Sequence, residues 1–176
     1  MSKPLKTLIH TALPSEARPL IQTLKLQQNS FFPKIYENDE TLLVISGMGK
    51  ANTLEALTDI FQSYTFERAI NVGIAGCRDE SYEIGTLFCT THDLKKSHEG
   101  DITTVEQPLD NKEALETLLV DMECEHFLKV ASKHLPKEQC MVFKVVSDYC
   151  NTSIPKKSFV IELIQKHVQT IQGYIK

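Results

Sequence analysis

The sequence predicts an α/β domain built around a largely parallel sheet. Apolar, β-branched segments that are typical of strands alternate along the chain with amphipathic segments that are typical of helices. One such run, residues 41–46 (TLLVIS), is apolar almost throughout, as expected for a strand that is buried on both faces. The strands end in short clusters of small or polar residues, where open α/β sheets bind ligands. The length of 176 residues predicts a single domain, residues 1–176.

Each predicted element depends on a local signal. The periodicity predicts strands over residues 5–13, 31–36, 41–46, 68–72, 84–91 and 139–146. It predicts helices over residues 16–26, 50–64, 113–134 and 156–172. Ser15 is the expected N-cap of the first helix, and Gly173 is the expected stop of the last. Residues 73–76 are expected to end the strand before them. Residues 92–111 are expected to form a loop, with a short strand within it as the alternative, and residues 147–155 are expected to form a loop.

Composition narrows the class of protein. A hydrophobic content of 41% is sufficient for a packed core, and a net charge of −4 argues against a general nucleic-acid or anionic-membrane surface. The apolar stretch near the N-terminus is too short for a signal peptide, so a cytoplasmic location is expected. Five irregularly spaced cysteines without a C-x-x-C pair predict reduced thiols and no zinc site. No metal and no other cofactor is expected.

Four of the predicted strand ends carry residues suited to ligand binding. These ends are residues 12–16, 46–49, 73–77 and 147–148. Because the carboxyl ends of parallel strands meet at one edge of a sheet, the four clusters are expected to converge on one site.

Five short stretches then point to a family. Residues 12–16 (ALPSE), 46–50 (SGMGK), 71–76 (NVGIAG), 120–123 (VDME) and 147–148 (SD) occur in the order seen in the purine nucleoside phosphorylase and uridine phosphorylase family. The chain most resembles the nucleosidase branch, which contains 5′-methylthioadenosine/S-adenosylhomocysteine nucleosidase and futalosine hydrolase. The resemblance covers about residues 7–159. It implies a three-layer phosphorylase/hydrolase-like fold, with a central mixed, largely parallel sheet flanked by helices.

The resemblance also implies N-glycosidic bond cleavage, through a transition state that resembles an oxocarbenium ion. Asp148 would donate a proton to the leaving purine, and Ser147 would orient it. Glu16 matches the glutamate that activates the attacking water. Glu123 would accept hydrogen bonds from the ribose hydroxyls, and Met122 would pack against the sugar.

The remaining expected contacts with a purine nucleoside follow from the same resemblance. They are Ala12, Ile74, Ala75, Gly76, Lys144 and Phe159. The glycines would let the backbone approach the ligand and donate N–H groups to it. Phe159 is preferred over Phe88 and Tyr149 as the ring that contacts the base.

Water is the expected nucleophile. Phosphorylases of this family carry a Gly-Asp-Pro-x-Arg motif that holds phosphate, and this chain has no such motif. Arg68 lies at the far end of its strand, and the spacing of Arg18 is not that of the motif. A phosphorylase with a phosphate site around Arg18 and Lys144 is the weaker alternative.

Three departures from the family pattern favour another alternative, a nucleoside-binding or interaction protein that has lost catalytic power. Ile74 cannot supply the hydroxyl that the family has at this position, and Lys144 replaces an arginine. The stretch over residues 93–122 is several dozen residues shorter than in typical relatives. The shortened stretch also favours a homodimer, since it would leave apolar surface in need of a partner.

Overall fold

The computed structural model describes residues 3–151 and 153–175. The helices are α1 (Pro14–Leu24), α2 (Lys50–Ser63), α3 (Cys124–Ala131), α4 (Lys157–Gln165) and α5 (Val168–Gln172). The strands are β1 (Lys3–Thr11), β2 (Gln27–Gln28), β3 (Ile35–Glu37), β4 (Thr41–Ile45), β5 (Tyr64–Cys77), β6 (Leu87–Cys89), β7 (His98–Glu99), β8 (Ile102–Thr104), β9 (Leu119–Asp121) and β10 (Cys140–Asp148). Two short 3₁₀ turns, η1 (Lys112–Ala114) and η2 (Lys137–Gln139), complete the described elements.

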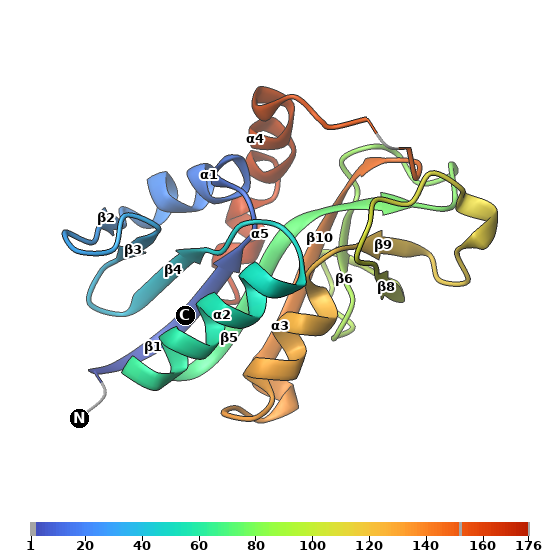
Figure 1. Cartoon of the computed structure of the whole chain (residues 1–176). Helices are drawn as coiled ribbons and strands as arrows, with labels where there is room; N and C mark the ends of the chain where they lie inside the picture. The colour runs from blue at the N-terminus through green and yellow to red at the C-terminus, as the bar shows by residue number, and fades with distance from the viewer. Residues whose placement is uncertain (1–2, 152, 176) are drawn as a thin grey trace.

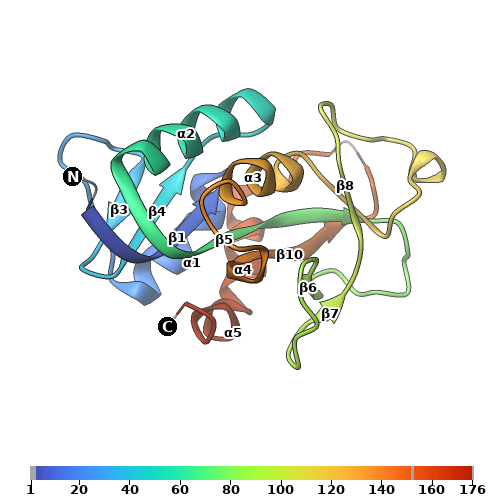
Figure 2. The same ribbon diagram turned by 90° about the horizontal axis from the view of Figure 1, so that it is seen from below.

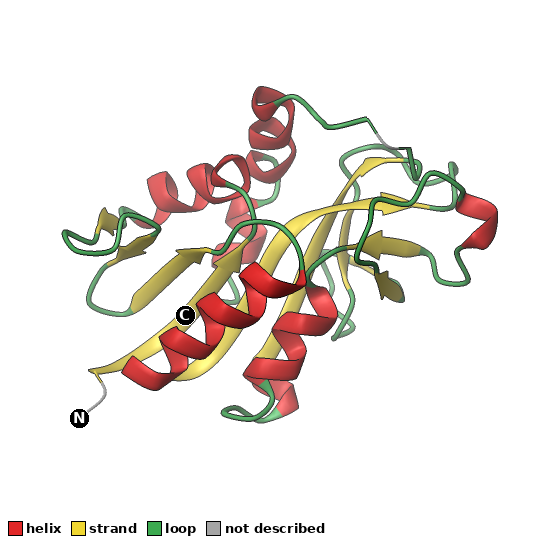
Figure 3. Cartoon of the chain, in the orientation of Figure 1, coloured by secondary structure: helices red, strands yellow, loops and turns green. Residues whose placement is uncertain are grey.

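The strands form one mixed sheet with a parallel centre (Figures 1 and 3). Its main order is β2-β3-β4-β1-β5-β10-β6-β7, and β4, β1, β5 and β10 run parallel to one another. Antiparallel β3 and β6 flank this centre. Strand β9 pairs antiparallel with the end of β5 and parallel with β8. The sheet is therefore largely parallel in its core, as the sequence predicts.

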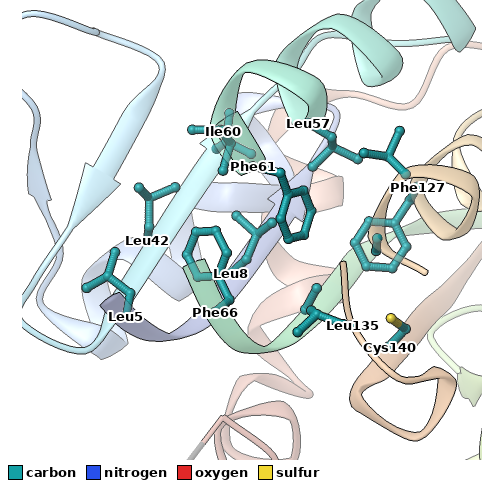
Figure 4. Close-up of a cluster of buried hydrophobic side chains, with 14 of the residues drawn as sticks. Leu5, Leu8, Leu42, Leu57, Ile60, Phe61, Phe66, Phe127, Leu135 and Cys140 are labelled. Atoms are coloured by element: carbon teal, nitrogen blue, oxygen red, sulfur yellow. The ribbon is translucent and has the colours of Figure 1, made fainter. Parts of the chain in front are cut away.

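Helices cover both faces of the sheet, so the domain has three layers. Figure 2 shows α2 and α3 on one face and α1, α4 and α5 on the other. A large apolar cluster fills the first interface, where Leu8, Leu57 and Phe127 are fully buried (Figure 4). A second cluster, which includes Ile9, Leu20 and Ile164, fills the other. The alternation along β1 explains this division, because successive side chains of a strand point to opposite faces.

The first helix begins at Pro14, and Leu13 rather than Ser15 is its N-cap, so the prediction of a serine cap is wrong. Proline is favoured at the first helical position because the N–H that it lacks has no partner inside a helix. The cap is instead provided by Glu16, whose carboxylate accepts a hydrogen bond from the backbone N–H of Leu13. This places the Glu16 side chain over the end of β1.

Strand β5 is longer than predicted. Residues 73–76 are expected to end the strand, but the strand continues through them to Cys77. This segment is held because β10 pairs with it along one edge, and β9 pairs with Gly76 and Cys77 on the other. The extended end of β5 carries the site residues from Ile74 to Gly76 on a rigid strand.

The predicted helix over residues 113–134 is also wrong. This segment contains η1, strand β9 and the shorter helix α3. Leu119 and Val120 bury their side chains as β9 pairs with β5 and β8, and tertiary pairing thus overrides the local helical pattern. Glu123 is consequently the N-cap of α3 and does not lie inside a helix.

Smaller differences occur elsewhere. The strand expected over residues 31–36 is reduced to β3, with Phe31 and Phe32 exposed, and the one expected over residues 84–91 is reduced to β6. The single helix expected over residues 156–172 is two helices, α4 and α5. Gly173 is the C-cap of α5, as predicted. Ser147 and Asp148 are the last residues of β10 and do not lie in a loop.

Among the described residues, no helix is long and apolar enough to cross a membrane. All five cysteines are buried free thiols.

Candidate active site

Glu16 lies beyond the carboxyl end of β1 and is held by three backbone N–H groups. Its Oε2 accepts from Ala12 N at 3.0 Å and from Leu13 N at 2.9 Å, and its Oε1 accepts from Ile74 N at 3.0 Å. The side chain is 3% exposed. The carboxylate therefore bridges the ends of β1 and β5 in one fixed orientation.

Lys144 approaches Glu16 across Gly73. The two residues Gly73 and Lys144 are paired in register on β5 and β10. A Cβ placed on Gly73 would lie 3.0 Å from Glu16 Oε1 and 3.1 Å from Lys144 Nζ, so both charged atoms approach the same point. Any side chain at this position would push the two groups apart. Gly73 thus leaves the space that both side chains border.

Lys144 forms a buried ion pair with Asp121. The Nζ–Oδ2 distance is 2.7 Å, and both side chains are almost completely buried. Asp121 Oδ2 also accepts from the backbone N–H of Cys124 at 2.8 Å, and Asp121 Oδ1 accepts from Thr104 Oγ1 at 2.7 Å. Asp121 thereby ties β10, β8 and the start of α3 together.

Glu123 completes the group. Its Oε1 accepts a hydrogen bond from Gly49 N at 3.0 Å, and it is 7% exposed. Gly47 and Gly49 adopt φ values of 91° and 85°, a left-handed conformation that favours glycine, so the sequence of this loop allows the close approach. We call Glu16, Asp121, Glu123 and Lys144 the buried charge cluster.

The buried charge cluster contains three carboxyl groups and one ammonium, and this imbalance determines its protonation. Burial raises the pKa of Glu16 to about 7, and the nearby charge of Glu123 adds to the rise, whereas Lys144 opposes it. Burial also raises the pKa of Glu123, with Lys144 and Gly49 N opposing. A carboxyl group with a pKa near neutrality is suited to exchange protons at physiological pH.

The other two members are held in their charged forms. Burial by itself would lower the pKa of Lys144, but the carboxylates of Asp121 and Glu123 outweigh it and raise the pKa above its ordinary value. Burial would likewise raise the pKa of Asp121, but the charge of Lys144 and the hydrogen bonds from Lys144 and Thr104 lower it below its ordinary value. Asp121 and Lys144 therefore form a fixed ion pair beside Glu16 and Glu123.

Ser147 and Asp148 lie at the end of β10, farther along the same edge. Ser147 Oγ donates to Asp148 Oδ2 at 2.6 Å and also lies 3.3 Å from the carbonyl oxygen of Ala75. Asp148 Oδ1 accepts from Asn151 N at 3.3 Å. A Cβ on Gly76 would lie 3.1 Å from Asp148 Oδ1, so this glycine allows the carboxylate to lie against β5. Unlike Glu16, Asp148 is partly exposed.

Other predicted contacts lie around these two groups. Ala12 donates its N–H to Glu16 and accepts from Gly47 N at 3.0 Å, which makes its backbone the link between the two loops. Ile74 and Met122 are partly exposed beside buried residues of the cluster. The structure thus brings the predicted residues from Ala12 to Asp148 to one edge of the sheet.

The aromatic candidates differ in availability. Phe88 is fully buried and packs with Tyr82 and His98, so it cannot contact a base. The Tyr149 hydroxyl donates to the carbonyl oxygen of Tyr82 at 2.8 Å. Phe159, in the first turn of α4, is partly buried against the apolar cluster that α1 and α4 share. Of the three rings, Phe88 is therefore excluded.

A hydrogen-bonded chain behind the cluster was not anticipated from the sequence. Ser46 Oγ donates its single hydrogen to Gly47 O at 2.7 Å, so His10 Nε2, 2.8 Å away, must donate to Ser46. His10 Nδ1 then accepts from the Asn71 amide at 2.8 Å. Burial lowers the pKa of His10 to about 3, with Lys144 contributing, so the ring is neutral. These hydrogen bonds support the glycine loop, residues 47–49, whose Gly49 N–H binds Glu123.

Asp121 was also missed, although it lies in the quoted VDME stretch. The available signal was an acidic residue two positions before Glu123 in an otherwise apolar strand. An isolated buried carboxylate requires a partner. The only clue to that partner was Lys144, an equally unusual charge within an apolar run.

Two surface hollows lie away from this site. One, of about 540 Å³, is lined by Arg78, Asp79 and Lys112 among others, and one of about 450 Å³ is lined by residues near Pro4 and Glu40. Neither includes a member of the buried charge cluster or the Ser147–Asp148 pair. The candidate site is identified by the chemistry of its carboxylates.

Comparison with known proteins agrees with this arrangement. No family model matches the chain. The aminodeoxyfutalosine nucleosidase of Campylobacter jejuni is 28% identical over 111 residues, which are 60% of this chain and 48% of that protein. A 5′-methylthioadenosine/S-adenosylhomocysteine nucleosidase of Lysinibacillus sphaericus is 34% identical over 68 residues, which are 39% of this chain and 29% of that protein.

Solved structures show the same fold. A futalosine hydrolase mutant of Helicobacter pylori matches with a TM-score of 0.80 and 14% identity, over 97% of this chain and 98% of that one. A mutant nucleosidase of the same organism, with 5′-methylthioadenosine in its active site, matches with the same TM-score, identity and coverage. The chain thus has the phosphorylase/hydrolase-like α/β fold.

The particular relationship follows from both comparisons. The chain is similar in sequence to nucleosidases of the purine nucleoside phosphorylase and uridine phosphorylase family and has their fold, which confirms the resemblance predicted from the sequence. The chain spans about half the length, or less, of the curated relatives that it matches.

Proposed function

We propose that the protein is a purine nucleosidase that cleaves the N-glycosidic bond of a methylthioadenosine- or futalosine-type nucleoside with water. The observation that carries the proposal is the Glu16 carboxyl group. It is held by three backbone N–H groups, and burial raises its pKa to about 7. A fixed carboxyl group that is half ionised at neutral pH is suited to act as a general base.

The reaction assigns one role to each part of the site. Glu16 accepts a proton from water as the water oxygen bonds to the ribosyl carbon. The glycosidic bond breaks, and its electron pair leaves with the purine. The leaving purine takes a proton from Asp148. Glu123 accepts hydrogen bonds from the ribose hydroxyls, and Met122 packs against the sugar. Ser147, which donates to Asp148 at 2.6 Å, orients the acid.

Glu16 and Asp148 contact different parts of β5. Glu16 binds the N–H of Ile74, and Asp148 lies against Gly76. The proposed general base and the proposed acid are thereby held at separate positions along one strand.

The charges favour water over phosphate. Phosphate binding requires cationic donors, preferably arginines, that are free to contact it. Lys144 is already paired with Asp121, and Arg18 is exposed on α1. The ionised carboxylates of Glu16 and Glu123, which have no such ion pair among the described residues, would repel a phosphate anion.

The proposed contact between Phe159 and the purine, and the backbone contacts from Ala12, Ile74, Ala75 and Gly76, belong to the same proposal. They are the part that an adenine-bound structure would test directly.

The experiment is release of free base from methylthioadenosine, S-adenosylhomocysteine and aminofutalosine, measured with and without phosphate. We expect release without phosphate, and we expect Asp148→Asn to reduce it by about 10²–10⁴-fold. Release that depends on phosphate would establish the phosphorylase alternative. Full activity in Asp148→Asn would remove its role as the acid.

Binding without turnover is the second outcome to distinguish. Purine binding in calorimetry, with no base released over hours, would establish a nucleoside-binding protein that has lost activity. Ile74 and Lys144, which depart from the family pattern, favour this alternative. If no purine nucleoside or base binds, both proposals are wrong.

We also propose a homodimer. Met48, in the glycine loop, and Ile154, after β10, are exposed by 54% and 90%, and both lie in loops that flank the site residues. Sedimentation at several protein concentrations would test this, and a monomer at micromolar concentration would contradict it.

A further inference from the structure

Asp121 has no role in the proposed reaction, yet it has more partners than any other member of the buried charge cluster. It accepts from Lys144, Thr104 and the backbone N–H of Cys124, and Glu123 N lies 3.3 Å from its Oδ2. It lies on β9, and the ammonium that it binds comes from β10. A carboxylate that is buried to this extent is costly unless its partners are fixed.

The position of Lys144 determines what that pairing does. Its ammonium lies beside Glu16, across the gap that Gly73 leaves, and its direct ion pair is with Asp121. A cation that is free to pair with Glu16 would hold that carboxylate ionised and weaken it as a base. Because Asp121 neutralises the cation at 2.7 Å, only part of the field of Lys144 reaches Glu16 and Glu123.

We infer that Asp121 is a positioning residue: it takes up the charge of Lys144 and thereby leaves Glu16 able to accept a proton from water near neutral pH. This inference rests on the proposed nucleosidase function. It adds a residue that tunes the base without touching the substrate.

The charged groups around Glu16 are limited in number. Lys144 from β10 and Glu123 from the start of α3 act on it directly, and Asp121 from β9 acts through Lys144. His10 from β1 is neutral. The helix that packs against α1 is α4, and its charged residues Lys157 and Glu162 are exposed, as is Lys166, its C-cap.

The inference predicts opposite shifts in two variants. Asp121→Asn keeps an oxygen that can accept from Cys124 N but removes the negative charge, so the field of Lys144 falls on Glu16 and lowers its titration midpoint by about one pH unit. Lys144→Gln removes the cation and raises the midpoint. Asp121→Glu keeps the charge and should restore the midpoint close to that of the wild type.

The test is a carboxyl ¹³C NMR titration of Glu16 in the protein without ligand, with Glu16→Gln to assign the signal. Thr104→Val is the matched control, since it removes a hydrogen bond to Asp121 without changing a charge, and its midpoint should stay at the wild-type value. A structural role alone would move the stability of Asp121→Asn but not its Glu16 midpoint.

Each outcome decides the inference. An unchanged or raised midpoint in Asp121→Asn overturns it, and so does a midpoint in Thr104→Val that falls as far. If Asp121→Asn does not fold, the Glu16 midpoint in Lys144→Gln is compared with that of the wild type. An unchanged midpoint in Lys144→Gln would show that Lys144 does not act on Glu16, and this result would overturn the inference. The titration needs no turnover, so a protein that releases no base would refute the proposed function and leave this test intact.

Where the nucleosidase is active, kinetics give a second readout. The acid limb of the kcat/KM profile should move to lower pH in Asp121→Asn by the same amount as the NMR midpoint. A fall in kcat without a shift of the limb would contradict the inference.

Discussion

The two halves of the candidate site are built differently. Glu16, Lys144, Asp121 and Glu123 are buried, and their charged atoms are bound to one another or to backbone N–H groups. Asp148 is partly exposed, and its two recorded hydrogen bonds come from Ser147 and Asn151, near the exposed loop that follows β10.

The difference indicates which half is organised before a ligand arrives. Preorganised dipoles and charges are effective because they need no rearrangement during the reaction. The half that contains Glu16 and Glu123 has this property, whereas the half around Asp148 has fewer constraints. On the proposed function, the purine itself completes the half around Asp148.

The largest effect should come from the buried half. Glu16→Gln removes the proposed general base, and we expect kcat/KM to fall by about 10²–10⁴-fold. In the wild type the carboxyl must be ionised to accept a proton, so with its pKa raised to about 7 the rate should rise as the pH passes through 7. Steady-state assays from pH 5 to 9 would measure the fall in kcat/KM and its dependence on pH. If Glu16→Gln keeps the acid limb of the wild-type profile, a group other than Glu16 is titrating.

Lys144→Met should cost the most stability, because it leaves Asp121 buried without its cation. Removing one partner of a buried ion pair costs about 3–5 kcal/mol. Urea unfolding would measure the loss. Lys50→Met breaks the exposed pair with Glu106 and is the matched control, with a far smaller expected change. Equal losses in the two variants would contradict the distinction between the buried and exposed pairs.

Ser46→Ala tests the support behind the glycine loop. It leaves the Nε2 hydrogen of His10 unpaired in a buried position, and we expect a loss of about 1–3 kcal/mol in the free energy of unfolding. Ser97→Ala is the control, since the Ser97 hydroxyl has no hydrogen-bond partner among the described residues. Thermal melts of the two variants should differ accordingly, and equal melts would show that the chain through His10 adds no stability.

The smallest effect should come from Ser147→Ala in the open half. Loss of one hydrogen bond to Asp148 is worth about 0.5–1.5 kcal/mol, which corresponds to a fall in kcat of up to about tenfold. We expect no measurable change in stability. A fall as large as that of Glu16→Gln would show that the two halves are equally dependent on preorganisation.

Much of the fold was predictable because it depends on local patterns. The apolar runs of β1, β4 and β10 and the periodicity of α2 were sufficient to predict a largely parallel sheet. Asp148 and Ser147 were predictable as a strand-end pair, and their hydrogen bond agrees with the orienting role expected of the serine.

The two errors that most affect the site share one physical cause. The segment over residues 113–134 has helical spacing, but strand β9 within it completes the pairing of β5 and β8. In the same way, residues 73–76 look like the end of a strand until β10 pairs with them along one edge and β9 pairs with Gly76 on the other. Hydrogen bonds between distant segments decided both cases, and no local window contains them.

The sequence by itself determined which carboxyl groups are present at the strand ends and that the class of protein is α/β. Only the tertiary structure decided that Lys144 pairs with Asp121 rather than with Glu16, and that Glu16 is left with a pKa near 7. The physical reason is that burial and charge pairing depend on distances across strands β5, β9 and β10. Those distances exist only after the sheet has formed.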